Sequence, residues 1–396
     1  QSYSVLFKRT CIGNAEEFLM QALEGLLVVS IEQAVAAPFC SARLVQAGAR
    51  VIKIERDEGD FARGYDTAAK GESSYFTWLN QGKESVCLDF KSDEGAFVLW
   101  AILEKADVFI QNLSPGALAR AGFSTTKMLS VNPKLIICNI SGYGDEGEVA
   151  KKRAYDLLVQ AESGLISISG APEAPGRVGV SVCDIGAGMT AYSAVLEALH
   201  RRERTGHGEL LSVSLFGVAA EWMAVPYLHA VYGKGAPKPV GLKHPSIAPY
   251  GAFRCSDDRL ILISIQNERE WERLCKDVLH SESIFQCAAY GNNNDRVSNR
   301  DDLERDITVI TSKMNSAEFQ ERLQQASIAY GAINTPDDLS THPAFRTQIS
   351  RTADGQELLV PAHPVKRNDI VDEGELRSPQ IGEHTRSVLD EFSRQK

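Results

Sequence analysis

The sequence predicts an α/β protein with a Rossmann-like large domain, built on a parallel sheet, and a smaller α/β domain. Three observations favour this fold class. Short apolar runs alternate with helical stretches in the first half of the chain, only a few residues separate them, and the composition is that of a globular protein, with 43% hydrophobic and 24% charged residues among 396. Such alternation is typical of βαβ units, whose parallel strands are buried on both faces.

The first run, LLVVSI at 26–31, has the length and composition of a buried strand, and a helical stretch follows it. Gly48 ends that helix, and VIKIER is the next strand. The same order then recurs along the chain. The expected strands are 26–31, 51–56, 85–90, 107–113 and 135–141, and the expected helices are 37–47, 95–106 and 115–121.

A longer helix is expected over 184–203, where apolar residues recur with a helical period and Asp184 is a candidate N-cap. A glycine-punctuated turn then leads into another strand. Residues 233–246 contain three glycines and three prolines, which is typical of a domain crossing. Beyond it, a strand at 260–265 and helices around 268–279 and 299–327 form the smaller domain. Residues 340–396 read as strand-poor and end in a capped helix.

Charge and cysteine usage exclude several classes of function. The net charge of −10 argues against nucleic-acid and anionic-membrane partners, and no apolar run approaches the ~20 residues that span a bilayer. The eight cysteines are scattered without C-x-x-C or zinc-type spacing, which predicts reduced thiols, no metal site and a reducing compartment. Lys8 and Arg9 hint at a presequence that Glu16 and Glu17 stop, so cytoplasm and mitochondrial matrix both stay open.

One nucleotide-binding motif is present only in part. Gly142, Gly144 and Gly147 form G-x-G-x-x-G after a strand, but the charged stretch EVAKKRAYD follows where a dinucleotide site needs a helix. The sequence therefore predicts a glycine-rich loop rather than a nicotinamide site. Neither G-x-S-x-G nor a phosphate-binding P-loop occurs in the sequence.

The first histidine is His200, so a histidine base within the N-terminal α/β stretch is excluded. The remaining candidates are carboxylates, chiefly Asp156 and Asp184. The ordinary interpretation of Asp184 is a helix cap. The alternative is a nucleophile that the helix terminus keeps ionised, with Gly186 and Gly188 leaving room for a substrate carbonyl.

Several segments resemble CoA-transferase family III (CaiB/BaiF type), which includes the α-methylacyl-CoA racemases. The similarity runs in order from residue 23 to about 390. It includes LEGLLVVSIEQAVAAPFCSARLVQAGARVIKIER, YFTWLNQGKESVCLDFKSDEG, DVFIQNLSPGALARAGF, ISGYGDEG, YDLLVQAESGLISISGAPEAPGRVGVSVCDIGAG, LEALHRRERTGHGELLSVSL and IGEHT.

The resemblance implies a CoA-transferase in which Asp184 is the nucleophile. It attacks an acyl-CoA thioester, forms a mixed anhydride and releases CoA thiolate. An acceptor carboxylate is then converted to its own CoA thioester through an enzyme-bound aspartyl-CoA type intermediate. Because anhydride and thioester are close in energy, CoA moves without ATP. CoA thioester is the substrate, and no tightly bound cofactor or metal is expected.

The resemblance also implies the supporting residues. Asp156 matches an acidic position beside the active site, and Val35 stands where oxalate/formate-type members have Gln. The matched CoA-binding positions, whose basic members form a patch for phosphates, are Arg56, Leu88, Lys91, Asn112, Leu113, Arg120, Arg153 and Tyr155.

Departures from the family pattern narrow the reaction. Racemases use a His-Asp dipeptide where this chain has Tyr155-Asp156, which disfavours α-proton exchange. Val35 and the absence of polyglycine in 244–253 disfavour formyl-CoA:oxalate transfer. HPSIAPYGAF and IQNEREW resemble the branch that acts on short C4–C5 dicarboxylates, such as mesaconyl-CoA, itaconate, succinate or glutarate. Cations that would hold the free carboxylate are Arg63, Lys243 and His244.

We therefore expect a succinyl-CoA:dicarboxylate CoA-transferase with itaconate as the leading acceptor. Alternatives are intramolecular transfer within mesaconyl-CoA, an α-methylacyl-CoA racemase and a CoA-thioester-binding activator subunit. The resemblance implies an interlocked homodimer. The expected domains are an N-terminal extension (1–22), a large CoA-binding domain (23–224), a small domain (225–330) and a C-terminal segment (331–396) that returns to the large domain.

Overall fold

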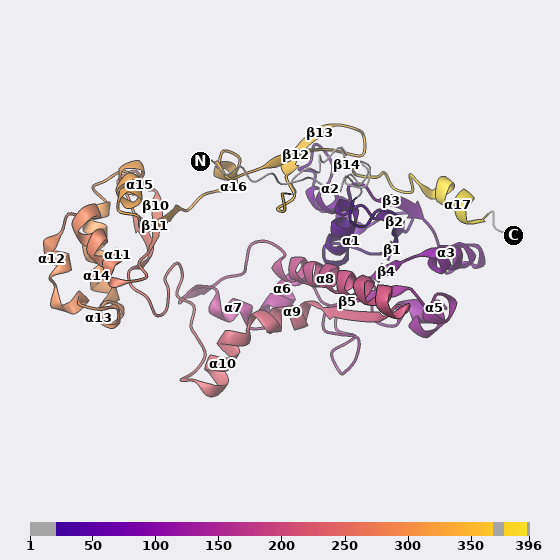
Figure 1. Cartoon of the computed structure of the whole chain (residues 1–396), viewed down its shortest axis with the longest axis horizontal. Helices are drawn as coiled ribbons and strands as arrows, with labels where there is room; N and C mark the ends of the chain where they lie inside the picture. Colours follow the sequence, from indigo (N-terminus) through magenta and orange to yellow (C-terminus); the bar gives the residue numbers. More distant parts are fainter. Residues whose placement is uncertain (1–20, 367–375, 394–396) are drawn as a thin grey trace, which may run out of the picture. The chain divides into compact units, whose positions relative to one another are not determined.

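The computed structural model describes residues 21–366 and 376–393 (Figure 1). The chain divides into two compact units. The first unit contains the described residues up to Ser163, Val178–Val225 and the described residues from Arg346 onward, and the second contains Gly164–Arg177 and Pro226–Phe345. Most of the expected N-terminal extension, including Lys8, Arg9, Glu16 and Glu17, lies outside the described residues.

A six-stranded parallel sheet in the order β3-β2-β1-β4-β5-β8 forms the centre of the first unit. This arrangement confirms the predicted α/β class. The strand order reverses between β1 and β4, and in open parallel sheets such a point opens a crevice at the carboxyl ends of the strands. The strands are β1 (Leu27–Ile31), β2 (Arg50–Glu55), β3 (Glu84–Cys87), β4 (Val108–Gln111), β5 (Ile136–Ser141) and β8 (Leu210–Ser214).

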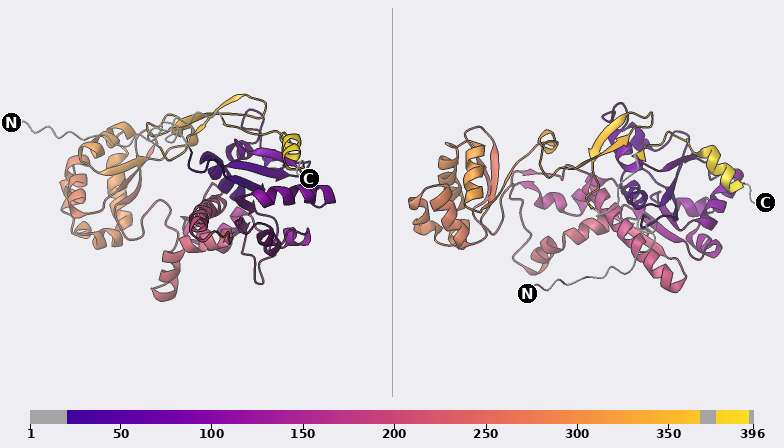
Figure 2. Two further views of the ribbon diagram at one scale, coloured as in Figure 1. Left: turned by 45° about the vertical axis from the view of Figure 1, so that its right-hand side comes forward. Right: turned by 45° about the horizontal axis from the view of Figure 1, so that its top comes forward.

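Helices cover both faces of this sheet because its strands are apolar on both sides. Alternate residues separate into two cores: Val28 and Val108 face one group of helices, whereas Val29 and Phe109 face the other. The first group is α1 (Ala36–Gln46), α8 (Val182–Thr205) and α9 (Leu215–Trp222), and the second is α3 (Asp93–Lys105), α5 (Thr125–Val131) and α17 (Thr385–Ser393) (Figures 1 and 2).

The strands end earlier than the sequence predicts. β3 stops at Cys87 and β4 at Gln111, so Leu88, Asn112 and Leu113 lie in loops beyond the sheet edge. These loops are where the parallel sheet can present side chains to a ligand. The other elements of the first unit are η1 (Phe61–Gly64), α2 (Ser74–Asn80), α4 (Ala117–Arg120) and α6 (Asp156–Glu162).

The prediction that residues 340–396 are strand-poor is wrong. A three-stranded sheet in the order β13-β12-β14 forms there, from short strands whose polar residues conceal the alternation, as in TQISR. The expected final helix is present as α17, which packs on α3 and buries Val388 and Phe392. The strands are β12 (Thr347–Arg351), β13 (Glu357–Pro361) and β14 (Leu376–Arg377).

The second unit is built on an antiparallel sheet in the order β11-β10-β9, against which its helices bury Trp271, Ile307 and Phe319 (Figure 2). The helical region at 299–327 forms two helices because Asn315 caps a new one. The elements are α7 (Leu165–Ile168), β6 (Gly170–Ala171), β7 (Ala174–Pro175), β9 (Tyr250–Arg254), β10 (Leu260–Ser264), α11 (Glu268–Arg273), η2 (Leu274–Val278), α12 (Glu282–Phe285), η3 (Ala288–Tyr290), α13 (Asn293–Ser298), α14 (Arg300–Thr311), α15 (Ser316–Gln325), β11 (Ala329–Ala332) and α16 (Pro336–Leu339), and α10 (Ala224–Tyr232) leads from the first unit into the second.

Candidate active site

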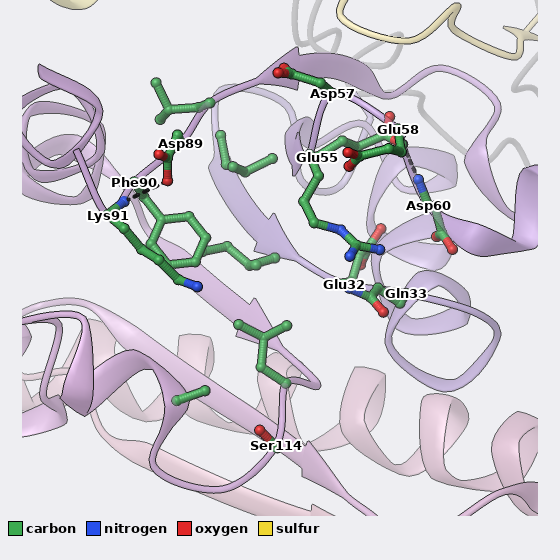
Figure 3. Close-up of a pocket in the computed structure, with 17 residues that line it drawn as sticks. Glu32, Gln33, Glu55, Asp57, Glu58, Asp60, Asp89, Phe90, Lys91 and Ser114 are labelled. Carbon is green, nitrogen blue, oxygen red and sulfur yellow. Dashed lines mark hydrogen bonds between the residues drawn. The ribbon is translucent and has the colours of Figure 1, made fainter.

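A cavity of about 460 Å³ opens at the carboxyl ends of β1, β2 and β4, at the reversal of strand order. In Figure 3, Phe90 and Lys91 lie on one side of it, and Glu32, Gln33 and Asp60 lie on the other. The loops that follow the strands supply most of the lining. The cavity therefore occupies the position where doubly wound α/β folds bind their ligands.

Four of the eight predicted CoA-binding residues line this cavity: Arg56, Leu88, Lys91 and Leu113. Among its described lining residues, Arg56 and Lys91 are the only cations, and both are exposed. The same lining contains six acidic residues, so the groups in it that suit a phosphate are this arginine and this lysine.

The other four predicted residues lie outside the cavity lining. Asn112 is used by the fold, because its side-chain amide donates to the Gln33 carbonyl at 2.8 Å and accepts from the Gln33 N–H at 2.9 Å. Arg120 is exposed on α4, and Arg153 and Tyr155 are exposed in the loop before α6. Their contact with CoA stays a prediction.

Asp184 lies in the first turn of α8 but is not its N-cap, which corrects the expectation from the sequence. The helix begins at Val182 after the cap residue Ser181, so Asp184 is its third residue. The first-turn amides are instead satisfied from α6: the Cys183 and Asp184 N–H groups donate to Oδ1 of Asp156, at 2.7 and 3.2 Å. This leaves the Asp184 carboxyl free of the capping role.

Asp156 is itself held in place. Its other oxygen, Oδ2, accepts from Nε2 of Gln160 at 2.7 Å, and Oε1 of Gln160 accepts from the Val178 N–H at 2.9 Å. Asp156 is buried at the start of α6. The hydrogen bonds therefore join α6, the segment before α8 and the first turn of α8 into one unit that fixes the backbone of Asp184.

Burial, and after it the nearby charge of Asp156, together raise the pKa of Asp184 to about 7. The expectation that the helix terminus keeps Asp184 ionised is therefore wrong at the site itself, because Asp156 takes the first-turn amides. A carboxylate that is poorly solvated and more basic than usual is also a stronger nucleophile. The arrangement suits covalent chemistry at near-neutral pH.

The two glycines near Asp184 serve helix packing, not access for a carbonyl. A Cβ on Gly186 would lie 2.3 Å from the Trp222 ring, and one on Gly188 would lie 2.6 Å from the Ala36 carbonyl oxygen. The absence of side chains allows α8 to approach α9 and the start of α1. This corrects the role assigned to them from the sequence.

Two side chains that surround Asp184 connect it to loops far away in the sequence. Ile185 packs on the small apolar cluster of Val35, Phe39 and Leu79. The phenol of Tyr65 interacts electrostatically with the Asp184 carboxylate, and burial together with nearby acidic groups raises its pKa to about 12. Tyr65, which is 46% exposed, therefore stays protonated at neutral pH, and the sequence analysis did not single it out.

The cations predicted to hold a substrate carboxylate have other partners. The Arg63 guanidinium lies 2.7 Å from Oε1 of Glu55, donates to the Pro379 carbonyl and stacks over Phe76 at 3.6 Å. These contacts use Arg63 to join segments of the first unit, and they leave its role toward a substrate without support.

Lys243 and His244 belong to the second unit. Lys243 pairs with Glu304 at 2.6 Å, and the His244 ring stacks on Tyr250 with its Nδ1 accepting from the Ser246 N–H. These partners give both side chains a structural use, and their role toward a substrate stays a prediction.

The glycines at 142–147 form turns, and the next helix, α6, begins only at Asp156. This is the glycine-rich loop that the sequence predicts. Over residues 21–366 and 376–393, no group of three or more His, Cys, Asp and Glu side chains is placed to hold a metal ion. In the same part of the chain, no helix is long and apolar enough to span a membrane.

Comparison with known proteins gives a consistent family. The sequence profile of CoA-transferase family III matches residues 23–385. The acetyl-CoA:oxalate CoA-transferase of Acetobacter aceti is 31% identical, with 93% of this chain and 95% of the relative covered. The succinate–glutarate CoA-transferase of Agrobacterium fabrum is 30% identical, and the match covers 93% of this chain and 95% of the relative. A crystal structure of a CaiB/BaiF family protein from Brucella suis superimposes with a TM-score of 0.83 at 28% identity. The superposition covers 94% of this chain and 99% of the Brucella suis chain.

Replacement of the buried carboxyl should make stability less dependent on pH. The folded-state pKa of Asp184, about 7, lies above its ordinary value near 3.8, so the folded protein loses stability as pH rises between these values. We expect the free energy of unfolding of Asp184→Asn to exceed that of the unaltered protein at pH 8, by at most about 4 kcal/mol, and by much less at pH 4. Equal differences at both pH values in thermal unfolding would contradict this.

The rate of attack by Asp184 should follow its ionisation. We expect kcat/KM for an acyl-CoA donor to rise with pH through about 7, because only the carboxylate attacks. Asp156→Asn removes the like charge and should move the midpoint to lower pH, while burial keeps it above the ordinary value. A pH–rate profile of both proteins measures this, and a midpoint that stays in place or moves upward would argue against the coupling.

Proposed function

The chain belongs to CoA-transferase family III, and we propose that it moves CoA from succinyl-CoA to a short-chain dicarboxylate, with itaconate as the leading acceptor. The observation that carries the proposal is the poorly solvated carboxyl of Asp184, with a pKa raised to about 7, beside hydrogen-bonded Asp156. A carboxylate in this setting can accept and return an acyl group by itself. Neither ATP nor a metal ion is required by the steps below.

Each half of the reaction exchanges one bond for another. An Asp184 carboxylate oxygen attacks the thioester carbonyl of succinyl-CoA, the C–S bond breaks, and a succinyl-aspartyl anhydride and CoA thiolate form. The thiolate then attacks the aspartyl carbonyl, which releases succinate and leaves an aspartyl-CoA thioester. The acceptor carboxylate repeats these steps in reverse, so itaconyl-CoA leaves and the Asp184 carboxylate is restored.

Three features support a dicarboxylate acceptor. The relatives that resemble this chain are named for oxalate and for glutarate, both dicarboxylates. The segments 244–253 and 265–271 resemble the branch that acts on short C4–C5 dicarboxylates. The Tyr65 phenol, a donor near Asp184, supplies a neutral hydrogen bond for a carbonyl or a carboxylate oxygen. Itaconate is the acceptor that we favour among acids of this size.

The direct test mixes purified protein with succinyl-CoA and itaconate, without ATP, and follows the acyl-CoA species by liquid chromatography and mass spectrometry. We expect itaconyl-CoA to appear with equal loss of succinyl-CoA, and Asp184→Asn to slow this exchange by about 10³-fold or more, because the nucleophile is lost. Oxalate, glutarate and mesaconate serve as competing acceptors. Faster exchange with one of them would replace itaconate.

Two further outcomes separate the alternatives. Conversion of mesaconyl-CoA alone into its isomer would favour intramolecular transfer. The activator subunit, which only binds CoA thioesters, would be favoured by two results together. The unaltered protein would exchange CoA with none of the acceptors, and Asp184→Asn would bind succinyl-CoA as tightly as the unaltered protein does.

The exposed helix α10 supports the proposal of a homodimer. Among its nine described residues none is buried, and five large hydrophobic side chains are at least half exposed. Apolar helices of this kind are covered by another surface in stable proteins, and a second copy of the chain is the partner that the family resemblance implies. The exposed residues are Val225, Tyr227, Leu228, Val231 and Tyr232.

Light scattering of the purified protein should give the mass of two chains. Val231→Glu, which places a charge on this surface, should shift the mass toward one chain. Val309→Glu alters a valine of similar exposure on α14, 53% against 52%, and should leave the dimer intact. A single-chain mass for the unaltered protein would rule out the homodimer.

A further inference from the structure

The loop between β1 and α1 contains a backbone conformation that its sequence does not favour. Ala34 has a φ of 63°, in the left-handed region, and it is not a glycine. A single alanine in this conformation costs on the order of 1 kcal/mol. The conformation therefore persists only because neighbouring groups hold it.

Asp60 supplies that restraint. Its Oδ1 atom accepts from the Ala34 N–H at 3.2 Å and from the Ala62 N–H at 2.9 Å, and the residue is only 3% exposed. One carboxylate oxygen thus joins the loop after β1 to the start of η1. Tyr65 directly follows η1 and is its C-cap residue.

Asp60 is fixed from its other side. Its Oδ2 atom lies 2.8 Å from Nζ of Lys53, whose side chain is fully buried, and its own N–H donates to Glu55 at 2.8 Å. An ammonium group buried within strand β2 gives the carboxylate one preferred orientation. Asp60 is therefore held rigidly enough to transmit its position to both segments.

Both segments lead toward Asp184. Ala34 and Ile185 pack on the same apolar cluster as Val35, and Ile185 is the residue after Asp184. The Tyr65 phenol interacts electrostatically with both the Asp60 and the Asp184 carboxylates. The loop at Ala34 and the segment that leads to Tyr65 thus share one anchor.

We propose that Asp60, held by Lys53, is a positioning residue for group transfer, because it fixes the start of η1 and the strained loop at Ala34, and that loop packs on the same apolar cluster as Ile185 at the Asp184 end of α8. This inference rests on the proposed CoA-transferase function. Asp60 also lines the cavity, but in this role it acts through the two segments that it holds. It determines where the Val35 side chain and the Tyr65 phenol stand when the thioester is attacked.

The test uses Asp60→Asn in the complete protein. The Asn Oδ1 can still accept both backbone hydrogen bonds. Its NH2 group would then face the Lys53 ammonium in place of Oδ2, so the ion pair that fixes the side chain is lost and both segments should shift. We expect kcat for CoA exchange to fall about tenfold or more, with KM for succinyl-CoA changed less than about threefold, since Arg56 and Lys91 remain. A rise in KM with kcat unchanged, or no change in either constant, would overturn the proposal.

A second substitution distinguishes positioning from general damage. Glycine adopts the left-handed conformation without cost, so the double variant Asp60→Asn/Ala34→Gly should recover part of the lost kcat. Absence of any recovery would contradict the role of the strained loop. The control is Asp257→Asn in the second unit, where a carboxylate likewise accepts from the Ser316 N–H and hydroxyl at the start of α15. It should lower thermal stability and leave kcat unchanged.

Ala34→Val covers the case in which Asp60→Asn fails to fold. A β-branched residue disfavours positive φ, so this variant should lower kcat with Asp60 intact. Its control is Lys70→Val, at an exposed residue that also has a positive φ, 53°, and this variant should retain kcat. Equal kcat for Ala34→Val and the unaltered protein would overturn the proposal. If the unaltered protein shows no CoA exchange with any acceptor tested, the proposed function itself fails. This result differs from a failure of the positioning role, in which the unaltered protein is active and the variants are equally active.

Discussion

The active end of the sheet depends on four charged side chains that are buried inside the first unit. Lys53 pairs with Asp60, and Lys83 pairs with Glu32 at 2.7 Å, all four with fully buried side chains. Burial opposes ionisation of Glu32, but Lys83 and Lys53 outweigh it and lower its pKa. Removing one member of such a pair leaves a buried charge unpaired, typically at a cost of about 3–5 kcal/mol. The loop after β1 is built on these pairs.

Asp184 stands in the opposite electrostatic situation. The buried charges beneath the loop have partners of opposite sign, whereas the nearest charge to Asp184 that affects its pKa is another carboxylate. Asp156 pairs with backbone amides and so holds the helix terminus without neutralising the nucleophile. The Asp184 carboxylate therefore stays poorly solvated and more basic than usual, which is the state that covalent transfer requires.

Much of this account follows from the sequence. The apolar strands, the α/β class, Asp184 and four cavity-lining CoA positions are all predicted from local runs and family motifs. The cap from Asp156 is not predictable, because it joins residues 28 positions apart through the tertiary fold. Gly186 and Gly188 face neighbouring helices that only the packing identifies. One signal was present: a lysine within the apolar strand VIKIE requires a buried partner, and Asp60 is that partner.

The measurement that tests the central claim most directly is chemical trapping of the enzyme-bound intermediate. The protein is incubated with succinyl-CoA alone, quenched with hydroxylamine and digested, and the peptide that contains Asp184 is sequenced by mass spectrometry. A hydroxamate at Asp184, absent without succinyl-CoA, is the predicted result, because hydroxylamine attacks anhydrides and thioesters of the aspartyl carbonyl but not a free carboxylate. A hydroxamate at another carboxylate, or at none while exchange proceeds, would contradict the account.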